Sequence, residues 1–415
     1  MLEPNLSQSD SKLLDWKTIS LLGVVHASSH FFQLVFPILF WYLSRDFGYD
    51  YVQLGFLVTC FFVISGLGQA SSGFVVDRIG PAPVMFFGLS AFVVSALLLA
   101  VAPNYAVLVC AALIGGAGNS VFHPVDYSVI NHQVSKERLG MAYSVHGLTG
   151  NLGWAAAPLF ITSLSALFGW RVAVFAVAAL ITLILIISVW QRDLWGSVQK
   201  NTDPDVELKS TSMGATFIAL TKMPTLWGAF LFFAFGSIAL SAIQNYTIPL
   251  LSSEYQISQI LAGSTLSAYM VAAAIGMLCG GFLAGATPNT ERIVFLSLCT
   301  AGALMLLLAL GVVGSTGAML LVVAAGFCSG IAAPSRDMLI RRVTPKGATG
   351  AVYGLVYSGM DVGASIAPIA FGFMIDAQLA RGPWFGAAGA FVMSAALAVA
   401  VAYWRTARPS TVSVG

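Results

Sequence analysis

The segment Ser120–Tyr127, SVFHPVDY, places an imidazole and a carboxylate three residues apart between long apolar runs. An imidazole exchanges protons near neutral pH, and a carboxylate can carry a proton or bind a cation. Ionisable side chains inside an apolar segment are costly unless they are paired or hydrated. We therefore treat His123 and Asp126 as candidates for function. Pro124 lacks a backbone N–H, so it also frees a carbonyl group of the helix beside them.

Further polar side chains recur within other apolar runs. Residues four positions apart share a helix face, so His26 and His30 form one polar face and Tyr357 and Asp361 another. Asp361 is an isolated acid near the centre of its run, which makes it the best candidate for a proton carrier. The residues predicted to bind solute or protons are His30, His123, Asp126, Tyr127, His146, Asn151, Gln244, Asn245, Arg336, Tyr357 and Asp361.

The composition requires lipid as the solvent for most of the chain. Of its 415 residues, 58% are hydrophobic and only 9% are charged, whereas about 25% are charged in a soluble domain. The net charge of +2 gives no indication of nucleic-acid binding. We find no nucleotide-binding loop, no catalytic Ser-His-Asp spacing and no large soluble domain, so we predict that the chain is not an enzyme and uses no cofactor. The five cysteines are isolated from one another, which argues against a disulfide framework.

Twelve apolar runs are long enough to cross a bilayer, which takes about 20 residues. The expected fold is an all-α integral membrane protein with two pseudo-symmetric six-helix bundles. The predicted domains are a cytoplasmic tail (1–16), an N-terminal bundle (17–190), a cytoplasmic linker (191–222), a C-terminal bundle (223–404) and a second cytoplasmic tail (405–415). The runs lie near 18–43, 51–75, 82–102, 105–133, 139–167, 170–190, 224–251, 258–286, 291–313, 316–343, 347–376 and 384–404.

The basic residues between these runs predict the orientation. Of the 19 Lys and Arg residues, 16 fall on the side that holds both ends of the chain and the linker. Connections rich in Lys and Arg stay in the cytoplasm, so we expect both termini to be cytoplasmic. The polar, acid-bearing N-terminus does not have the pattern of a cleavable signal peptide. We expect a multi-pass protein of the cell inner membrane.

The two halves of the chain repeat at a constant offset of 210 residues. At this offset Pro124 meets Pro334, and Gly153 meets Gly363. Internal repeats of this kind are common in secondary transporters, whose solute site lies at the repeat interface near the bilayer midplane. The same offset pairs Asp126 with Arg336, and we predict that these two residues form a gating pair between the halves.

The connection GFVVDRIGPAPV, from Gly73, joins the second and third runs. Gly73 is expected to permit close helix approach, Asp77 and Arg78 to lie at the membrane edge, and Gly80 to form the turn. This pattern resembles the signature loop of the major facilitator superfamily, although Pro81–Pro83 stand where that loop usually has basic residues. The resemblance implies the fold of that superfamily, and a single chain that functions as a monomer.

The segment with which we began, followed by RLGMAYSVHGLTGNLGWAAAPL, resembles fosmidomycin-resistance efflux proteins, which carry similar His-Pro and Gly-Asn-x-Gly segments. HASSHFFQLVFPILF, from His26, also resembles their first helix. The resemblance implies export by alternating access. With the acids and histidines as proton carriers, we predict a drug/proton antiporter for a small polar or anionic solute. The expected partners are this solute, protons and the lipid bilayer, without nucleic acid.

Two other functions fit the same residues. Sequence patterns do not fix the direction of transport, so an importer of an organic anion or a metal chelate is one alternative. The other is a transition-metal transporter, because histidines four residues apart suit metal ligation. Its ligands would be His26, His30, His123 and Asp126, whereas the main prediction includes no metal. Metal-dependent thermal stabilisation would distinguish the two.

Overall fold

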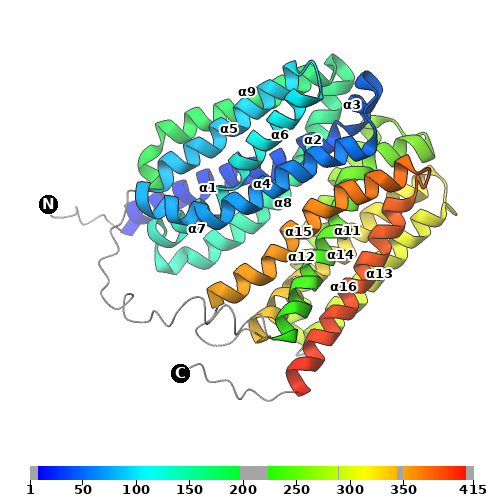
Figure 1. Ribbon diagram of the computed structural model, residues 1–415. Coiled ribbons are helices and arrows are strands. Elements are labelled where there is room, and N and C mark those ends of the chain that lie inside the picture. The colour runs from blue at the N-terminus through cyan, green and yellow to red at the C-terminus, as the bar shows by residue number, and fades with distance from the viewer. Residues whose placement is uncertain (1–7, 197–222, 288, 344–348, 408–415) are drawn as a thin grey trace. The chain divides into compact units, whose positions relative to one another are not determined.

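We analysed a computed structural model of the chain, in which residues 8–196, 223–287, 289–343 and 349–407 are described. All regular secondary structure in these ranges is helical (Figure 1). Parts of the predicted tails (1–7 and 408–415) and of the predicted linker (197–222) lie outside the described residues. The chain divides into two compact units: one holds the described residues of Met1–Gly48 and Cys60–Lys200, the other those of Tyr49–Thr59 and Asn201–Gly415.

The helices follow the predicted apolar runs closely. Eleven helices within the described ranges are long and apolar enough to cross a membrane. The larger helices up to the linker are α1 (Gln8–Gln33), α4 (Tyr51–Ile79), α5 (Pro81–Val101), α6 (Tyr105–Asn119), α7 (Phe122–Gln133), α8 (Leu139–Phe168) and α9 (Trp170–Trp190). After it come α11 (Pro224–Tyr255), α12 (Gln259–Ala286), α13 (Thr290–Leu310), α14 (Ser315–Val343), α15 (Thr349–Asp376) and α16 (Gly382–Ala407).

The first predicted run, 18–43, is not one helix. The chain passes from α1 into two short helices, α2 (Val35–Ile38) and α3 (Phe40–Phe47). Pro37 explains the first break, because a proline cannot donate to the carbonyl group four residues earlier, here that of Gln33. α1 also begins at Gln8, whereas the predicted run begins at residue 18. Asp15 fixes its early turns by accepting a hydrogen bond from the Ser135 hydroxyl at 2.5 Å.

The fourth predicted run, 105–133, is also divided. α6 ends at Asn119, and α7 begins at Phe122. Pro124 lacks the N–H that would bond to Ser120, and the Ser72 hydroxyl donates to the freed Ser120 carbonyl at 3.0 Å. The predicted break in the backbone ladder at Pro124 is therefore confirmed. It lies directly before the segment that carries His123 and Asp126.

Both units use glycine to bring two helices into backbone contact. A Cβ atom at Gly153 of α8 would lie 2.1 Å from the Ala27 carbonyl oxygen of α1. In the other unit, a Cβ atom at Gly363 of α15 would lie 2.4 Å from the Ala234 carbonyl oxygen of α11. Small residues at such crossings let the backbones of membrane helices approach closely. The equivalence of Gly153 and Gly363 in the sequence repeat thus has a counterpart in packing.

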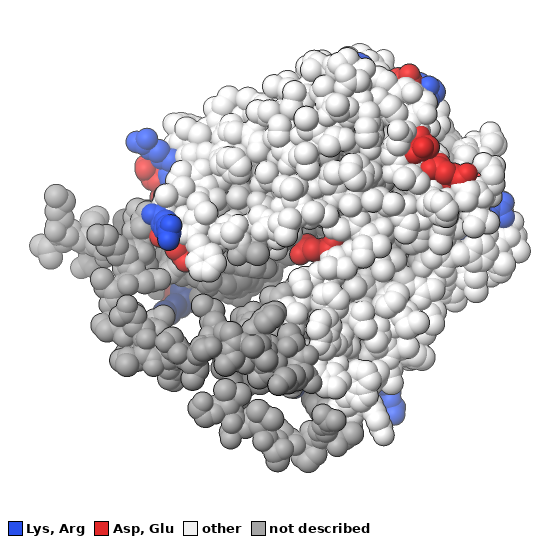
Figure 2. Space-filling view, viewed as in Figure 1, with Lys and Arg blue, Asp and Glu red and all other residues white. Residues whose placement is uncertain are grey.

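The surface of the helices suits a lipid environment. Most of the face in Figure 2 carries no charged side chain. Large apolar side chains are strongly exposed, among them Phe282 at 82% and Trp190 at 80%. Exposed apolar surface on this scale marks contact with a membrane or another apolar partner, so the multi-pass membrane fold follows from both the helices and their surface.

Candidate functional site

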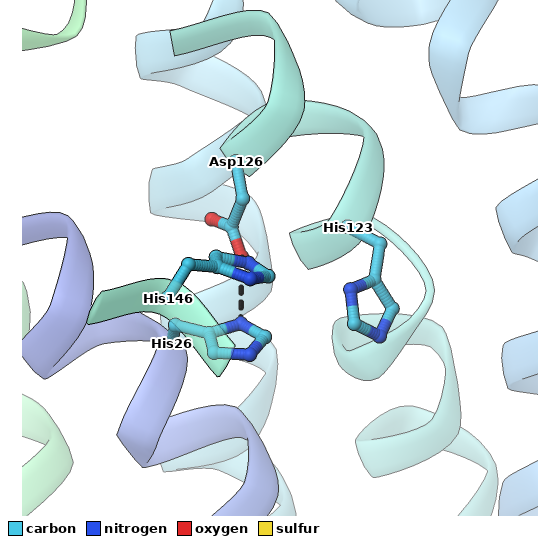
Figure 3. Close-up of side chains that lie close together, drawn as sticks. All are labelled: His26, His123, Asp126 and His146. Carbon is cyan, nitrogen blue, oxygen red and sulfur yellow. Dashed lines mark hydrogen bonds and ion pairs between the residues drawn. The ribbon is translucent and has the colours of Figure 1, made fainter. Parts of the chain in front are cut away.

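Asp126 of α7 is the most deeply buried carboxylate among the described residues, at 0% exposure. Its Oδ2 atom lies 2.8 Å from Nδ1 of His26 on α1 and 3.1 Å from Nε2 of His146 on α8. An ionised carboxylate at this position accepts a hydrogen bond from each imidazole. A buried carboxylate needs such donors, because no water compensates its charge. Three helices therefore converge on one oxygen atom (Figure 3).

Four of the five histidines of the chain surround this carboxylate. The rings of His26 and His146 stack with centroids 3.5 Å apart. His30 lies 4.6 Å from His26, and His123 lies 5.4 Å from it. Both ring nitrogens of His30 and Nδ1 of His123 are shielded from solvent and have no hydrogen-bond partner in the described ranges. We call His26, His30, His123, Asp126 and His146 the histidine cluster.

Glycine makes room for the histidine cluster. A Cβ atom at Gly150 of α8 would lie 2.9 Å from His30 Cε1 and 3.0 Å from His26 Nε2. One helical turn after Gly150, Gly153 allows α8 to lie directly against the backbone of α1. The imidazoles of α1 thus reach His146 because α8 has no side chain at these two crossing points.

A chain of hydrogen bonds begins at Trp154, which contacts His30, and crosses the first unit. The Trp154 ring lies 4.3 Å from that of His30 and is tilted against it by 49°, and the Trp154 N–H donates to Gln33 at 3.0 Å. The Gln33 amide donates to Asn119 at 3.1 Å, and the Asn119 amide donates to the Ser65 hydroxyl at 2.7 Å. Sequence reasoning did not identify Trp154 or Ser65. An indole N–H in the middle of an apolar helix was the available signal, since a buried indole usually finds an acceptor.

The other two predicted solute- or proton-binding residues of the first unit, Tyr127 and Asn151, are not members of the histidine cluster. Tyr127 is 44% exposed, and its ring lies 5.4 Å from that of His146, so it borders the cluster. Asn151 does not join the cluster, because its amide donates to the Gly147 carbonyl of its own helix at 3.0 Å. The structure therefore brings together four of the predicted solute- or proton-binding residues of this unit, with Tyr127 beside them and Asn151 apart.

The second unit contains a separate charged group on α14 and α15. Arg336 Nε donates to Asp337 at 2.8 Å, and the Tyr357 hydroxyl donates to the same carboxylate at 3.3 Å. The Arg336 guanidinium lies 5.0 Å above the ring of Phe233 on α11. Within its own unit, each member of the expected Asp126–Arg336 gating pair thus has partners. That pair stays a prediction.

The remaining predicted residues of the second unit include two polar groups without partners. The Asp361 carboxylate on α15 makes no hydrogen bond or ion pair with any described residue, and it is only partly exposed. On α11, Gln244 Nε2 is buried without a partner in the described ranges. Asn245 is satisfied locally, because its amide donates to the Ser241 hydroxyl at 2.7 Å.

The protein-family model for the Major Facilitator Superfamily matches residues 21–321 and 230–415 of this chain, which together cover nearly all of it. The chain belongs to the major facilitator superfamily. Membership makes it a membrane transporter rather than an enzyme, as predicted. The fold agrees with solved members: a bacterial homolog of the human lysosomal transporter Spinster matches with a TM-score of 0.75 at 16% identity, over 97% of this chain and 100% of that one. The nucleoside transporter NupG also matches at a TM-score of 0.75, with 14% identity, over 94% of this chain and 100% of that one.

Curated members of the superfamily are similar in sequence as well. The uncharacterized transporter YfnC of Bacillus subtilis is 27% identical over 311 residues, 73% of either chain. The fosmidomycin resistance protein of Escherichia coli is 27% identical over 274 residues, 64% of either chain. The resemblance noted around His123 and Asn151 therefore extends well beyond those two segments.

The signature loop of this superfamily member has the expected turn. α4 ends at Ile79, and Gly80 adopts a φ of +87°, a conformation that glycine allows at low cost. Asp77 and Arg78 are exposed. The expected close helix approach at Gly73 is not found, because a Cβ atom there would meet no described atom within 4 Å. The loop therefore has the expected turn and exposed charges, without a tight crossing at Gly73.

Proposed function

We propose that this transporter is a proton-coupled exporter that moves a small polar or anionic solute by alternating access. In this proposal a proton enters the cell as the solute leaves. Three features support it: an acid in the second unit without a partner among the described residues, buried nitrogen atoms of the same kind in both units, and the names of two relatives, which refer to drug resistance.

Asp361 carries the proposal. Its carboxylate lies within an apolar helix and has no hydrogen-bond or ion-pair partner among the described residues. An acid in this position is costly while ionised, so taking up a proton or meeting a cationic group stabilises it. Asp126 differs, because its carboxylate already accepts hydrogen bonds from two imidazoles. We therefore assign the coupling proton to Asp361.

Unpartnered nitrogen atoms support a polar or anionic solute. His30 has two buried ring nitrogens without partners in the described ranges, and Gln244 offers an amide N–H of the same kind. Arg336 adds a permanent positive charge, since a guanidinium stays protonated. Such donors match oxygen atoms of a phosphonate, carboxylate or hydroxyl group. We propose that His30 contacts the solute from the first unit, and that Gln244 and Arg336 contact it from the second, each at the stage of the cycle in which its unit is engaged.

The relatives support export. One is named a fosmidomycin resistance protein, and another is named a multidrug resistance protein B homolog, from Mycobacterium tuberculosis, at 28% identity over 30% of this chain. The basic residues favour cytoplasmic termini in the cell inner membrane. Because one chain contains both repeated halves, we propose that a monomer suffices.

Fosmidomycin accumulation in cells tests this proposal. Cells that express the intact chain are compared with cells that express Asp361→Asn and with an empty vector, each with and without an uncoupler. We expect accumulation to fall several-fold only with the intact chain and an intact proton gradient. Asp193→Asn is the matched control, because its side chain is 99% exposed and lies outside the apolar helices.

Each arm can contradict a different part of the proposal. Export that survives the uncoupler would contradict proton coupling. Export by Asp361→Asn at the rate of the intact chain would remove this carboxylate from the coupling step. Accumulation equal to the empty vector in every arm would exclude fosmidomycin as the solute while leaving the transporter fold unaffected.

A further inference from the structure

Four side chains of the histidine cluster are close enough together to share one ion. His26, His123, Asp126 and His146 each offer one ligand atom, and all four atoms lie within 4.8 Å of one another. They come from three helices and converge in the interior of the first unit, as Figure 3 shows. We propose that these four residues bind one divalent transition-metal ion, of which zinc is the representative. The proposal does not rest on proton-coupled export.

The types of ligand indicate the class of metal. Three imidazole nitrogens and one carboxylate oxygen suit zinc and its first-row neighbours, whereas magnesium and calcium prefer oxygen ligands. No thiolate takes part, since the five cysteines lie elsewhere and are free. An imidazole ligand must be neutral and the carboxylate ionised. Such a cluster binds a cation without adding other charges to the apolar interior.

Atoms without partners point to a missing ligand. Asp126 Oδ1 and His123 Nδ1 are buried, and neither has a hydrogen-bond partner in the described ranges. In a purely structural network buried polar atoms are almost always satisfied, because an unmade hydrogen bond leaves the full cost of desolvation. Both atoms belong to residues of the proposed site. A metal ion bound by these residues offsets that cost.

The distances between the ligand atoms show how far the side chains must move to bind zinc. Ligand atoms around tetrahedral zinc lie about 3.4 Å apart, given bonds of about 2.0–2.1 Å. His26 and Asp126 already meet at 2.8 Å, and His146 and Asp126 at 3.1 Å. These hydrogen bonds open slightly as the ion enters between them, while His123 moves inward. His123 is the partly exposed member, and its ring nitrogens make no hydrogen bond with any described residue that would resist the movement.

Zinc binding to the purified chain tests the proposal. The full-length protein, purified in detergent without a polyhistidine tag and stripped of metal, is titrated with zinc chloride by calorimetry. We expect one zinc ion per chain and a higher unfolding temperature with zinc. The second measurement replaces zinc with cobalt, whose visible absorption bands report four-coordinate nitrogen and oxygen ligation.

Two histidine variants on the same helix separate this site from nonspecific binding. His123→Ala removes a ligand without leaving a hydrogen-bond partner unsatisfied, so it should fold, and we expect its zinc affinity to fall about tenfold or more. His132→Ala is the matched control, since His132 also lies on α7 but is exposed and outside the cluster. We expect this variant to bind as the intact chain does.

Two results would overturn the proposal. One is an intact chain that binds no zinc, which would leave the cluster as a hydrogen-bonded network that fixes three helices. The other is a His123→Ala variant that binds zinc as tightly as the intact chain. Neither result depends on transport, so failure of this proposal and failure of proton-coupled export are distinguishable.

Discussion

His26 and Asp126 lie 100 positions apart in the sequence, and their side chains meet at 2.8 Å in the interior of the first unit. Asp126 is completely buried and His26 nearly so, at 0% and 2% exposure. This contact joins α1 to α7, and the second imidazole, His146, joins both to α8. The charge of one carboxylate therefore links three helices that are distant in the chain.

Removing this carboxylate should destabilise the fold. Leaving a buried imidazole N–H without its acceptor costs about 1–3 kcal/mol, because the group stays desolvated. We expect Asp126→Ala to lower the free energy of unfolding by this amount, with a smaller loss for Asp126→Asn. Thermal unfolding in detergent, monitored by tryptophan fluorescence, measures both. Asp193→Ala, at a fully exposed position, should leave the midpoint unchanged. An unfolding midpoint for Asp126→Ala equal to that of the intact chain would show that the contact does not hold these helices.

The glycine crossing between α1 and α8 provides a second test. Gly153→Ala places a methyl group 2.1 Å from the Ala27 carbonyl oxygen, so the two backbones must separate. Overpacking of this kind costs about 1–3 kcal/mol. Gly147→Ala is the matched control in the same helix, because its Cβ atom would meet no described atom within 4 Å. Alanine there favours the helix by up to about 1 kcal/mol. Equal unfolding temperatures for the two variants would argue against close packing at Gly153.

The ion pair of Asp46 near the end of α3 predicts how the stability of the fold depends on pH. Arg45 donates to Asp46 at 2.6 Å and chiefly accounts for a pKa of Asp46 below its ordinary value of 3.8, with a further contribution from the Trp170 N–H. A lowered pKa in the folded state gives stability that is present above pH 4 and is lost as the pH falls through the folded-state pKa. We expect the intact chain to unfold at a higher temperature than Asp46→Asn at pH 6, and the difference to shrink as the pH falls below the ordinary pKa of 3.8. A difference that stays constant over this range would contradict the assignment.

The fold could be predicted from the sequence because membrane helices are long apolar runs with polar connections. The places where helices break depend on which prolines interrupt the backbone hydrogen bonds. Pro124 was expected to disrupt its helix and does so, whereas Pro334, its equivalent in the repeat, lies within a continuous α14. Pro37 breaks the first run by the same mechanism as Pro124, and this break was not expected.

The histidine cluster was predicted only in part. The four-residue spacing of His26 and His30 was enough to place both imidazoles on one face of α1. The position of Asp126 between His26 and His146 was not predictable, because it depends on how α1, α7 and α8 are rotated against one another. For Asn151, in contrast, the spacing in the sequence was informative. It follows His146 by five residues, a rotation of about 140° around the helix, so the two side chains cannot share a face.

Proton movement that accompanies solute movement tests the central claim most directly. Everted membrane vesicles that contain the intact chain or Asp361→Asn are acidified inside by respiration, and fosmidomycin is added while a fluorescent dye reports the internal pH. The proposed exchange predicts release of protons from vesicles with the intact chain, with saturation as fosmidomycin increases, and no release from vesicles with Asp361→Asn. Uptake of fosmidomycin into vesicles with the intact chain, without any change of internal pH, would contradict it.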